Sequence, residues 1–340
     1  MTDTTEQQNA GTQGTHWRCE PDQDGVLWLC IDKADGSANV LSRPVLEELA
    51  EIIAALESKP PQGIVIYSGK KNGFIMGADI NEFTKIADPD QAYDLIRVGQ
   101  QVLERLGALR CPTVAAIQGF ALGGGLELAM ACDYRIIIDE QRPILGLPEV
   151  QLGIHPGFGG TVRSVRICGV RAAMQLMLTG QSVTADKARR INLVDRVVEA
   201  DNWKETARQL IAAKPDRAEA PLADRLLNLS LARPFVTSML RKQVAAKARP
   251  DHYPALYAII DLWRKHGASE RTGYEAEARS IAALMCGETS RNLVRVFFLQ
   301  NRLKSQGNKP STRVARVHVV GAGVMGGDIA AWCALRGLDV

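Results

Sequence analysis

Short apolar runs, glycine-bearing turns and helical patterns succeed one another over the first part of this chain, and this order constrains the fold most. Runs suited to buried strands occupy residues 26–31, 63–68, 113–117 and 134–138. Helical patterns lie between them, at residues 42–56, 88–109 and 123–132. Such alternation predicts an α/β unit with largely parallel strands, whose binding residues gather at the strand ends.

Beyond residue 162 the pattern becomes almost entirely helical. The clearest helical segments are expected at 170–179, 184–192, 203–213 and 290–303. Residues 304–313 have the composition of a linker, and residues 317–320 followed by glycines and an apolar segment suggest a strand, a turn and a helix. At 340 residues the chain is long enough for two or more units.

The composition excludes several classes of protein. The hydrophobic fraction of 46% and the charged fraction of 23% are typical of a soluble globular protein, and a net charge of +3 gives no general attraction to nucleic acid. The seven cysteines and five histidines are scattered without CxxC or zinc-type spacing, so we expect reduced thiols and no metal site. No apolar run approaches the roughly 20 residues of a membrane span.

The N-terminal residues 1–15 are polar and lack the cationic start and apolar run of a secretory signal. The two acidic residues among them, with no arginine, argue against a mitochondrial presequence. We expect a flexible tail on a cytoplasmic protein.

Three motifs suggest chemistry. The first is GFIMGADI at 73–80, the second is ALGGGLE at 121–127, and the third is GLPE at 146–149 followed by LGIHPGFGG at 152–160. Glycines in tight turns let backbone N–H groups approach a ligand, and a helix start adds its positive dipole end. The motifs also supply two carboxyl groups, Glu127 and Glu149. Each motif alone is an ordinary turn; in combination they suggest amides for an oxyanion and acids for proton transfer.

Together these motifs resemble the crotonase (enoyl-CoA hydratase/isomerase) superfamily over residues 17–201. The resemblance implies a crotonase-like ββα spiral fold with a helical C-terminal extension. It also implies an oxyanion hole made by the backbone amides of Ala78 and Gly124. Glu127 would orient and deprotonate water, and Glu149 would deliver the proton to the α-carbon. The substrate would be an acyl-CoA thioester, and hydration would need neither a cofactor nor a metal.

The same resemblance implies further substrate contacts at Met76, Gly77, Gly123, Pro156, Gly157 and Asn301. Other polar residues near the motifs have plainer explanations. His155 could line the acyl pocket, but packing or solvent exposure is the more common role of such a histidine. Asp79 is expected to cap its turn rather than to react. Asn39 and Ser42 lie where similar enzymes pass close to the CoA moiety.

The terminal segment GAGVMGG at 321–327 makes the resemblance more specific. The chain resembles the N-terminal part of the α subunit of the bacterial fatty-acid β-oxidation multienzyme complex, truncated early in its 3-hydroxyacyl-CoA dehydrogenase domain. The expected organisation is a tail (1–15), a crotonase domain (16–201), a helical extension with a linker helix (202–312) and a truncated Rossmann β-α start (313–340). A thiolase β subunit would be the partner in the full complex.

This resemblance places NAD at Gly321, Gly323, Met325 and Gly326, but only in a full-length parent. The acidic residue that would bind the adenosine ribose, about 20 residues past such glycines, is not in this sequence. We therefore expect neither hydride transfer nor saturable NAD binding by this chain.

The predicted function is hydration of trans-2-enoyl-CoA to (S)-3-hydroxyacyl-CoA, with Δ3-Δ2-enoyl-CoA isomerisation as a side activity. Two alternatives remain open. One is an oxidoreductase role, which would belong to the full-length parent. The other is a non-catalytic structural subunit of a β-oxidation complex. The sequence does not fix the acyl-chain length or the oligomeric state.

Overall fold

The structure is a computed structural model that describes residues 12–86, 88–139, 144–306 and 314–340. Most of the predicted tail (1–15) and of the predicted linker (304–313) lies outside these residues. The chain divides into two compact units, the first ending at Val294 and the second covering Arg295–Val340. The boundaries expected near residues 201 and 312 stay predictions.

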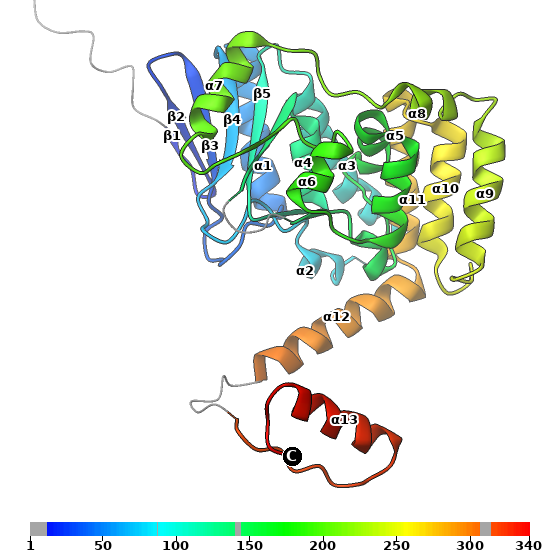
Figure 1. The fold of residues 1–340 in the computed structure, drawn as a ribbon. Coiled ribbons are helices and arrows are strands. Elements are labelled where there is room, and N and C mark those ends of the chain that lie inside the picture. The colour runs from blue at the N-terminus through cyan, green and yellow to red at the C-terminus, as the bar shows by residue number, and fades with distance from the viewer. Residues whose placement is uncertain (1–11, 87, 140–143, 307–313) are drawn as a thin grey trace, which may run out of the picture. The chain divides into compact units, whose positions relative to one another are not determined.

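A seven-stranded sheet forms the centre of the first unit, in the order β1-β2-β3-β4-β5-β7-β9 (Figure 1). Its strands are β1 (Thr12–Gln13), β2 (Trp17–Pro21), β3 (Val26–Ile31), β4 (Gly63–Ser68), β5 (Thr113–Gln118), β7 (Tyr134–Ile138) and β9 (Arg196–Val198). Neighbours from β3 to β9 are parallel, as predicted, whereas β1, β2 and β3 pair antiparallel. The sequence did not indicate this edge, because β2 is only partly buried and has no continuous apolar run.

A second sheet of two short parallel strands positions the motifs. It pairs β6 (Phe120–Leu122) with β8 (Ile144–Gly146), so that two segments far apart in sequence end side by side. Immediately after β6, the Gly123 N–H donates to the Gly146 carbonyl oxygen over 2.9 Å. The glycine triplet and the GLPE segment therefore leave this sheet at the same edge.

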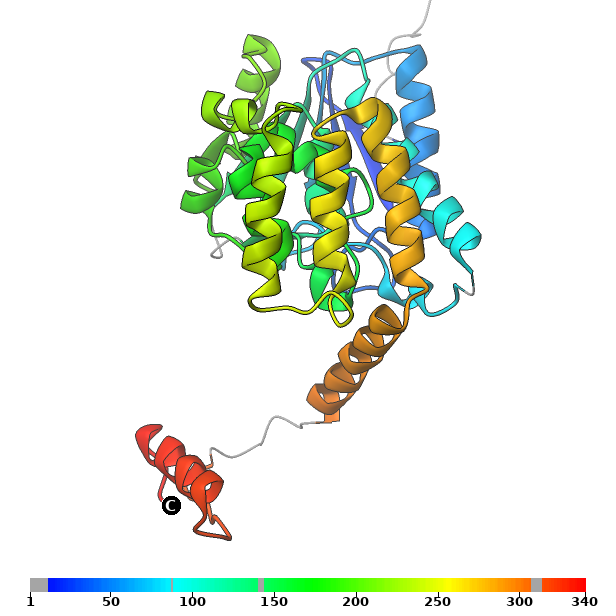
Figure 2. The same cartoon turned by 90° about the vertical axis from the view of Figure 1, so that its right-hand side faces the viewer.

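Helices cover both faces of the large sheet. The first unit contains α1 (Arg43–Ser58), α2 (Ile80–Phe83), α3 (Pro89–Gly107), α4 (Gly124–Ala131), α5 (Gly160–Thr179), α6 (Ala185–Arg190) and α7 (Trp203–Ala213). A further helical layer consists of α8 (Leu222–Leu227), α9 (Arg233–Ala245), α10 (Pro254–His266) and α11 (Glu270–Met285). Figure 2 shows α9, α10 and α11 lying side by side.

Helix α5 begins ten residues before the predicted start at residue 170. Gly169 interrupts it with a φ of 81°, so two helical segments meet at a kink and only the second has a clear pattern. The first segment, which was not predicted, is important for the candidate site, because the amides of Phe158 and Gly160 at its start lie there.

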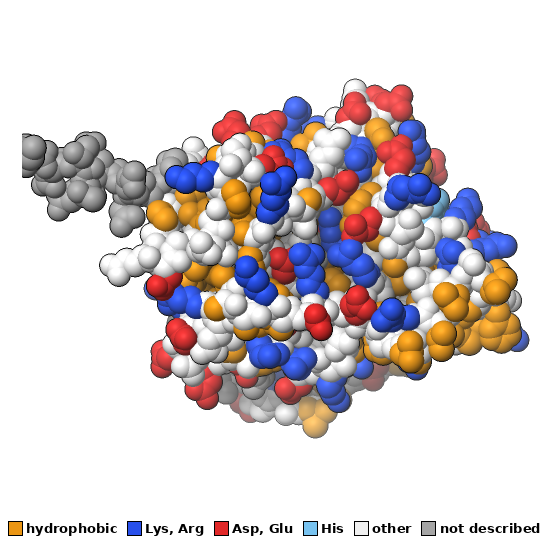
Figure 3. All heavy atoms as spheres, turned by 90° about the horizontal axis from the view of Figure 1, so that it is seen from above, with side chains coloured by type: hydrophobic (Ala, Val, Ile, Leu, Met, Phe, Trp, Pro, Cys, Tyr) orange, Lys and Arg blue, Asp and Glu red, His pale blue; other side chains and the backbone are white. Residues whose placement is uncertain are grey.

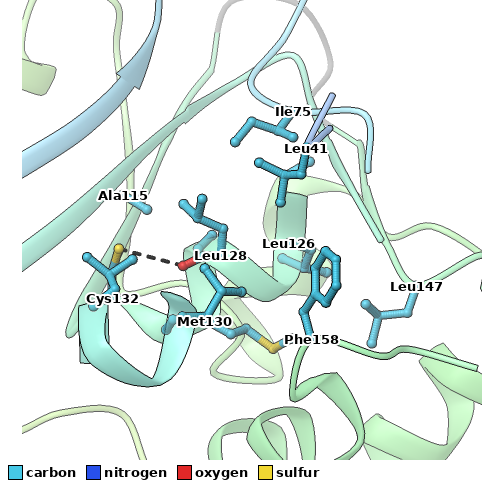
Figure 4. Packing of buried hydrophobic residues seen from close by; sticks show 14 of the residues in the cluster. Leu41, Ile75, Ala115, Leu126, Leu128, Met130, Cys132, Leu147 and Phe158 are labelled. Atoms are coloured by element: carbon cyan, nitrogen blue, oxygen red, sulfur yellow. Dashed lines mark hydrogen bonds between the residues drawn. The ribbon is translucent and has the colours of Figure 1, made fainter. Parts of the chain in front are cut away.

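The main apolar core lies between the sheet and α1, α3, α4 and α5. Figure 4 shows α4 within it, with Leu126, Leu128 and Met130 of the helix among buried side chains of other segments that include Ala115, Leu147 and Phe158. All eight residues of α4 are buried, which leaves Glu127 as a charged side chain on a fully enclosed helix. A smaller core on the other face of the sheet packs α7 against β4, β5 and β7.

Charges of both signs are interspersed over the face drawn in Figure 3. Apolar side chains gather at the edge formed by α9 and the segment before it, where Leu231 is 94% and Phe235 79% exposed. None of the helices in the described ranges is long and apolar enough to span a membrane.

Helix α12 (Glu288–Gln306) begins in the first unit and ends in the second. In the second unit α13 (Val324–Leu335) follows the glycine turn, and an isolated parallel bridge joins Arg316 and Asp339. The predicted strand at residues 317–320 is not formed as a strand, because only this one bridge offers it a partner. A Cβ on Gly326 would lie 2.0 Å from the Gly321 carbonyl oxygen, so the turn requires glycine there.

Candidate active site

The glycine triplet turns the chain sharply from β6 into α4. Gly123 has a φ of 49°, a conformation that glycine adopts without steric cost, and α4 starts at the next residue. A Cβ on Gly125 would lie 2.4 Å from the carbonyl oxygen of Ile75. The third glycine therefore lets α4 pass directly against the backbone of the GFIMGADI segment.

This close approach brings two backbone amides together. A Cβ built on Gly124 would lie 3.4 Å from the Ala78 nitrogen, and a Cβ built on Gly77 would lie 3.9 Å from the Gly124 nitrogen. Within the described ranges, neither the Ala78 N–H nor the Gly124 N–H donates a hydrogen bond to another group. Gly124 is buried and Ala78 partly buried, and two adjacent N–H groups without acceptors are suited to binding a carbonyl oxygen.

Glu127 lies in the first turn of α4 and is 2% exposed. Its Oε1 accepts hydrogen bonds from the Phe158 N–H over 2.8 Å and from the Gly160 N–H over 2.7 Å. Burial raises the pKa of Glu127 well above its ordinary value, and the charges of Glu149 and Glu277 raise it further, whereas these two amides lower it.

Glu149 begins a short 3-10 helix, Glu149–Leu152, directly after Pro148. Both of its carboxyl oxygens are closed to solvent and have no hydrogen-bond partner in the part of the chain that the structure describes. Its Oε1 lies 3.1 Å from the position of a Cβ built on Gly123, so the carboxyl group faces the glycine turn. Burial raises the pKa of Glu149 to about 8.

The two carboxyl groups differ in their hydrogen-bond donors. Burial raises the pKa of both, but two backbone N–H groups offset part of the rise at Glu127, whereas both carboxyl oxygens of Glu149 lack a donor. Because like charges also repel, the pair loses its protons in separate steps. Between these steps one group carries a proton while the other can accept one, beside two amides able to stabilise an oxyanion.

A third buried carboxylate lies close by and was missed by the sequence analysis. Glu277 on α11 is fully buried, and its charge is among the influences that raise the pKa of Glu127. It accepts hydrogen bonds from the Gly159 and Thr161 amides, 118 and 116 residues away in the sequence. A lone glutamate in a helical pattern carries no signal of such a contact, so sequence reasoning could not have found it.

Six further residues were predicted to contact the substrate. Met76 is 52% exposed beside the Gly77 turn, and Gly123 faces Glu149. Pro156 packs against Gly160, and Gly157 lies against α3 and α11, where a Cβ would meet an Ile281 methyl at 2.6 Å. Asn301 belongs to the second unit. The roles of all six as substrate contacts stay predictions.

The packing interpretation of His155 is confirmed. Its ring is buried, with Nδ1 2.7 Å from the Pro156 carbonyl oxygen and Nε2 2.8 Å from the Ser280 hydroxyl oxygen. Burial lowers the pKa of His155 to about 4, so the ring is neutral at physiological pH.

The capping role of Asp79 is also confirmed, because its side chain accepts from the Asn81 N–H at the start of α2. Asn39, which we expected near the CoA moiety, is buried and donates to Ile31, Ser68 and Phe74.

A cavity of about 720 Å³ lies elsewhere in the first unit. It opens at the C-terminal end of α4 and is lined by seven arginines and five acidic residues, of which Arg166–Glu270 and Arg217–Asp133 are ion pairs. Neither Glu127 nor Glu149 lines it. At the candidate site the Phe158 ring packs on Gly124, where a Cβ would meet it at 3.2 Å. We base the assignment on the carboxyl groups and amides, because the cavity is an ion-paired cleft open to solvent.

Across residues 12–86, 88–139, 144–306 and 314–340, no group of three or more His, Cys, Asp or Glu side chains is arranged to hold a metal ion.

Comparison with known proteins identifies one matching family. The sequence model of the enoyl-CoA hydratase/isomerase family matches residues 23–254, more than half of the chain. Among solved structures, the chain is similar to an enoyl-CoA hydratase from Rhodobacter sphaeroides, with a TM-score of 0.65 and 22% identity over 82% of this chain and 88% of that one. An enoyl-CoA hydratase from Bacillus halodurans gives a TM-score of 0.61 and 20% identity over 83% and 99% of the two chains. DspI from Pseudomonas aeruginosa gives 0.54 and 27% over 68% and 95%.

Proposed function

Because the chain belongs to the enoyl-CoA hydratase/isomerase family, also called the crotonase superfamily, we propose that it adds water to trans-2-enoyl-CoA to give (S)-3-hydroxyacyl-CoA. The observation that carries this proposal is the buried Glu149 carboxyl group, which has no partner and faces the glycine turn beside two unpaired amides. A buried polar group without a hydrogen-bond partner in the protein usually pairs with a ligand or a water molecule.

The proposed reaction begins with the thioester oxygen, which accepts hydrogen bonds from the Ala78 and Gly124 N–H groups. These donors are fixed in turns, so they stabilise the enolate-like charge without reorganisation. Glu127 takes a proton from water as the hydroxyl group adds to the β-carbon. Glu149 gives its proton to the α-carbon, and proton exchange with solvent restores both groups.

The surroundings of the two glutamates support this division of roles. A pKa of about 8 keeps Glu149 protonated at neutral pH, as a proton donor must be. Burial also raises the pKa of Glu127, and the Phe158 and Gly160 amides offset part of that rise, which assists its role as the base. The same pair could move a proton between C2 and C4, so we also propose Δ3-Δ2-enoyl-CoA isomerisation as a side activity.

The direct test is the loss of ultraviolet absorbance of crotonyl-CoA on hydration. Glu127→Gln and Glu149→Gln are each expected to lower kcat by roughly 10²- to 10⁴-fold, the range for loss of a general acid or base. Glu275→Gln serves as a control, because this half-exposed residue on α11 accepts from the Tyr93 hydroxyl and pairs with Arg279, and neither partner belongs to the site. Parental rates in both active-site variants would show that the site assignment is wrong.

A non-catalytic subunit of a β-oxidation complex is the alternative. Such a chain would bind a thiolase-like partner and turn over no enoyl-CoA. We favour catalysis, because a structural subunit has no need of an unpaired carboxyl group in its interior.

We further propose that residues 313–340 are the β-α start of a Rossmann dinucleotide-binding domain of the 3-hydroxyacyl-CoA dehydrogenase type. The support is the glycine turn before α13, the strict need for glycine at position 326 and the parallel bridge between Arg316 and Asp339. In this proposal NAD would contact Gly321, Gly323, Met325 and Gly326, and a thiolase β subunit would be a partner, only in a longer protein.

A further inference from the structure

The start of α5 presents four consecutive backbone N–H groups to two buried carboxylates. Phe158 and Gly160 donate to Glu127 over 2.8 and 2.7 Å. Gly159 and Thr161 donate to Glu277 over 2.6 and 2.9 Å. The four amides therefore alternate between a carboxylate from α4 and a carboxylate from α11.

Glu277 has further donors around it. Gln100 on α3 donates to its Oε1 over 2.9 Å, and the Thr161 hydroxyl donates to its Oε2. Gln100 also donates to the Tyr274 carbonyl oxygen over 3.0 Å, which ties α3 to α11. With four donors, the Glu277 carboxylate is saturated with hydrogen bonds, whereas Glu149 has none. This difference excludes Glu277 as a proton donor to substrate and indicates a holding role.

Residues 158–161, which form the turn between the Glu127 and Glu277 carboxylates, are also held by Arg163. Arg163 is 3% exposed and donates from Nη1 to the Phe158 carbonyl oxygen over 2.5 Å, while its guanidinium group lies over the Tyr274 ring. Gly159 has a φ of 96°, which glycine adopts without strain, and a Cβ there would lie 2.1 Å from Arg163 Nη1, so glycine lets the guanidinium group pack against the turn.

We infer that Glu277 is a positioning residue for the hydration reaction. By binding the Gly159 and Thr161 amides, it fixes the turn whose other two amides hold the Glu127 carboxylate. Helix α11 thereby completes the catalytic site, although it lies far along the chain from all three motifs. This inference rests on the proposed function of Glu127 as the base.

The test compares Glu277→Gln with Glu275→Gln, which removes the same charge from the same helix without facing Glu127. In Glu277→Gln we expect kcat to fall by about 10- to 100-fold with KM changed less than about threefold, because a misplaced base slows the chemical step. Removal of a neighbouring negative charge lowers the pKa of Glu127, so the acid limb of the pH profile should move to lower pH. Glu275→Gln should change neither quantity.

A purely structural role of Glu277 would lower stability but leave kcat and the pH profile of the folded fraction unchanged, and that result would overturn the inference. Should Glu277→Gln fail to fold, Thr161→Val removes one donor to Glu277 and leaves the backbone amide in place. It is expected to lower kcat by about two- to fivefold with KM unchanged. A parental kcat in this variant would likewise contradict the inference.

Carboxyl ¹³C NMR titration separates this inference from the proposed function. The Glu127 signal is assigned by its absence in Glu127→Gln, and its midpoint is compared between the parental chain and Glu277→Gln, or Thr161→Val if the former does not fold. A midpoint that moves to lower pH in Glu277→Gln, or that shifts measurably in Thr161→Val, supports the inference even if the parental chain does not hydrate crotonyl-CoA. An unchanged midpoint refutes it even if the parental chain is an active hydratase.

Discussion

Glu127 and Glu149 are both buried carboxyl residues, but only Glu127 has hydrogen-bond donors. A buried carboxyl group without donors is costly to ionise, and this cost falls on the folded state alone. At the scale of single residues, the site therefore has a measurable effect on stability as well as on catalysis.

We predict that Glu149→Gln stabilises the protein above pH 8. The folded protein holds the Glu149 proton up to about pH 8, whereas an unfolded chain releases it near the ordinary value of 4.5. Between these values the unfolded state binds fewer protons, so rising pH favours unfolding. The variant should exceed the parental free energy of unfolding by about 2–4 kcal/mol at pH 8.5 and by under about 1 kcal/mol at pH 5.

Urea unfolding at the two pH values measures this difference, and Glu275→Gln is the control. An equal difference between variant and parent at both pH values would mean that Glu149 ionises as readily in the folded state as in the unfolded one.

At the scale of elements, the turns that follow β6 and precede α2 decide where the free amides lie. The bridge between Leu41 and Ala78 uses the Gly77 carbonyl and the Asp79 N–H, and it leaves the Ala78 N–H unused. A change that removes this N–H therefore breaks no hydrogen bond of the bridge.

Ala78→Pro is predicted to lower kcat by about 10²- to 10³-fold, the usual effect of removing one oxyanion donor. Ala78→Ser keeps the N–H group and should retain activity within about threefold. Steady-state kinetics with crotonyl-CoA, together with circular dichroism to establish that both variants are folded, measure the effect. Comparable activity in the two variants would exclude the Ala78 amide from the oxyanion hole.

At the scale of the whole molecule, the two units differ in how much of their apolar surface is buried. The first unit has an extensive buried core, whereas in the second Trp332 and Leu335 on α13 are 60% and 80% exposed. Among the described residues of the second unit, one isolated parallel bridge joins Arg316 and Asp339.

We predict that this chain shows no saturable binding of NAD by calorimetry. The glycine turn is present, but the acidic residue that would bind the adenosine ribose is not in the sequence, and one bridge does not make the sheet edge on which a dinucleotide lies. Crotonyl-CoA, titrated into Glu149→Gln to avoid turnover, is the positive control for binding by the first unit. Saturable micromolar NAD binding would contradict the prediction.

The sequence by itself determined the parallel strands and the local motifs. Strands β3, β4 and β7 lie within the predicted runs because their residues are mostly apolar, and the glycine triplet marked the start of α4 because few other residues fit that turn. The family resemblance carried by these motifs indicated Ala78, Gly124, Glu127 and Glu149 as residues that would meet, and the structure brings them together.

Only the tertiary structure decided which amides hold Glu127, and it alone identified Glu277. The contact between α4 and α5 spans 33 residues and that between the start of α5 and α11 spans 118, so no local spacing in the sequence records them. The antiparallel edge β1–β2 and the kink at Gly169 were missed for a related reason. Local sequence patterns indicate which face of a helix or strand is buried. Which other segment packs on that face depends on contacts between residues far apart in the sequence.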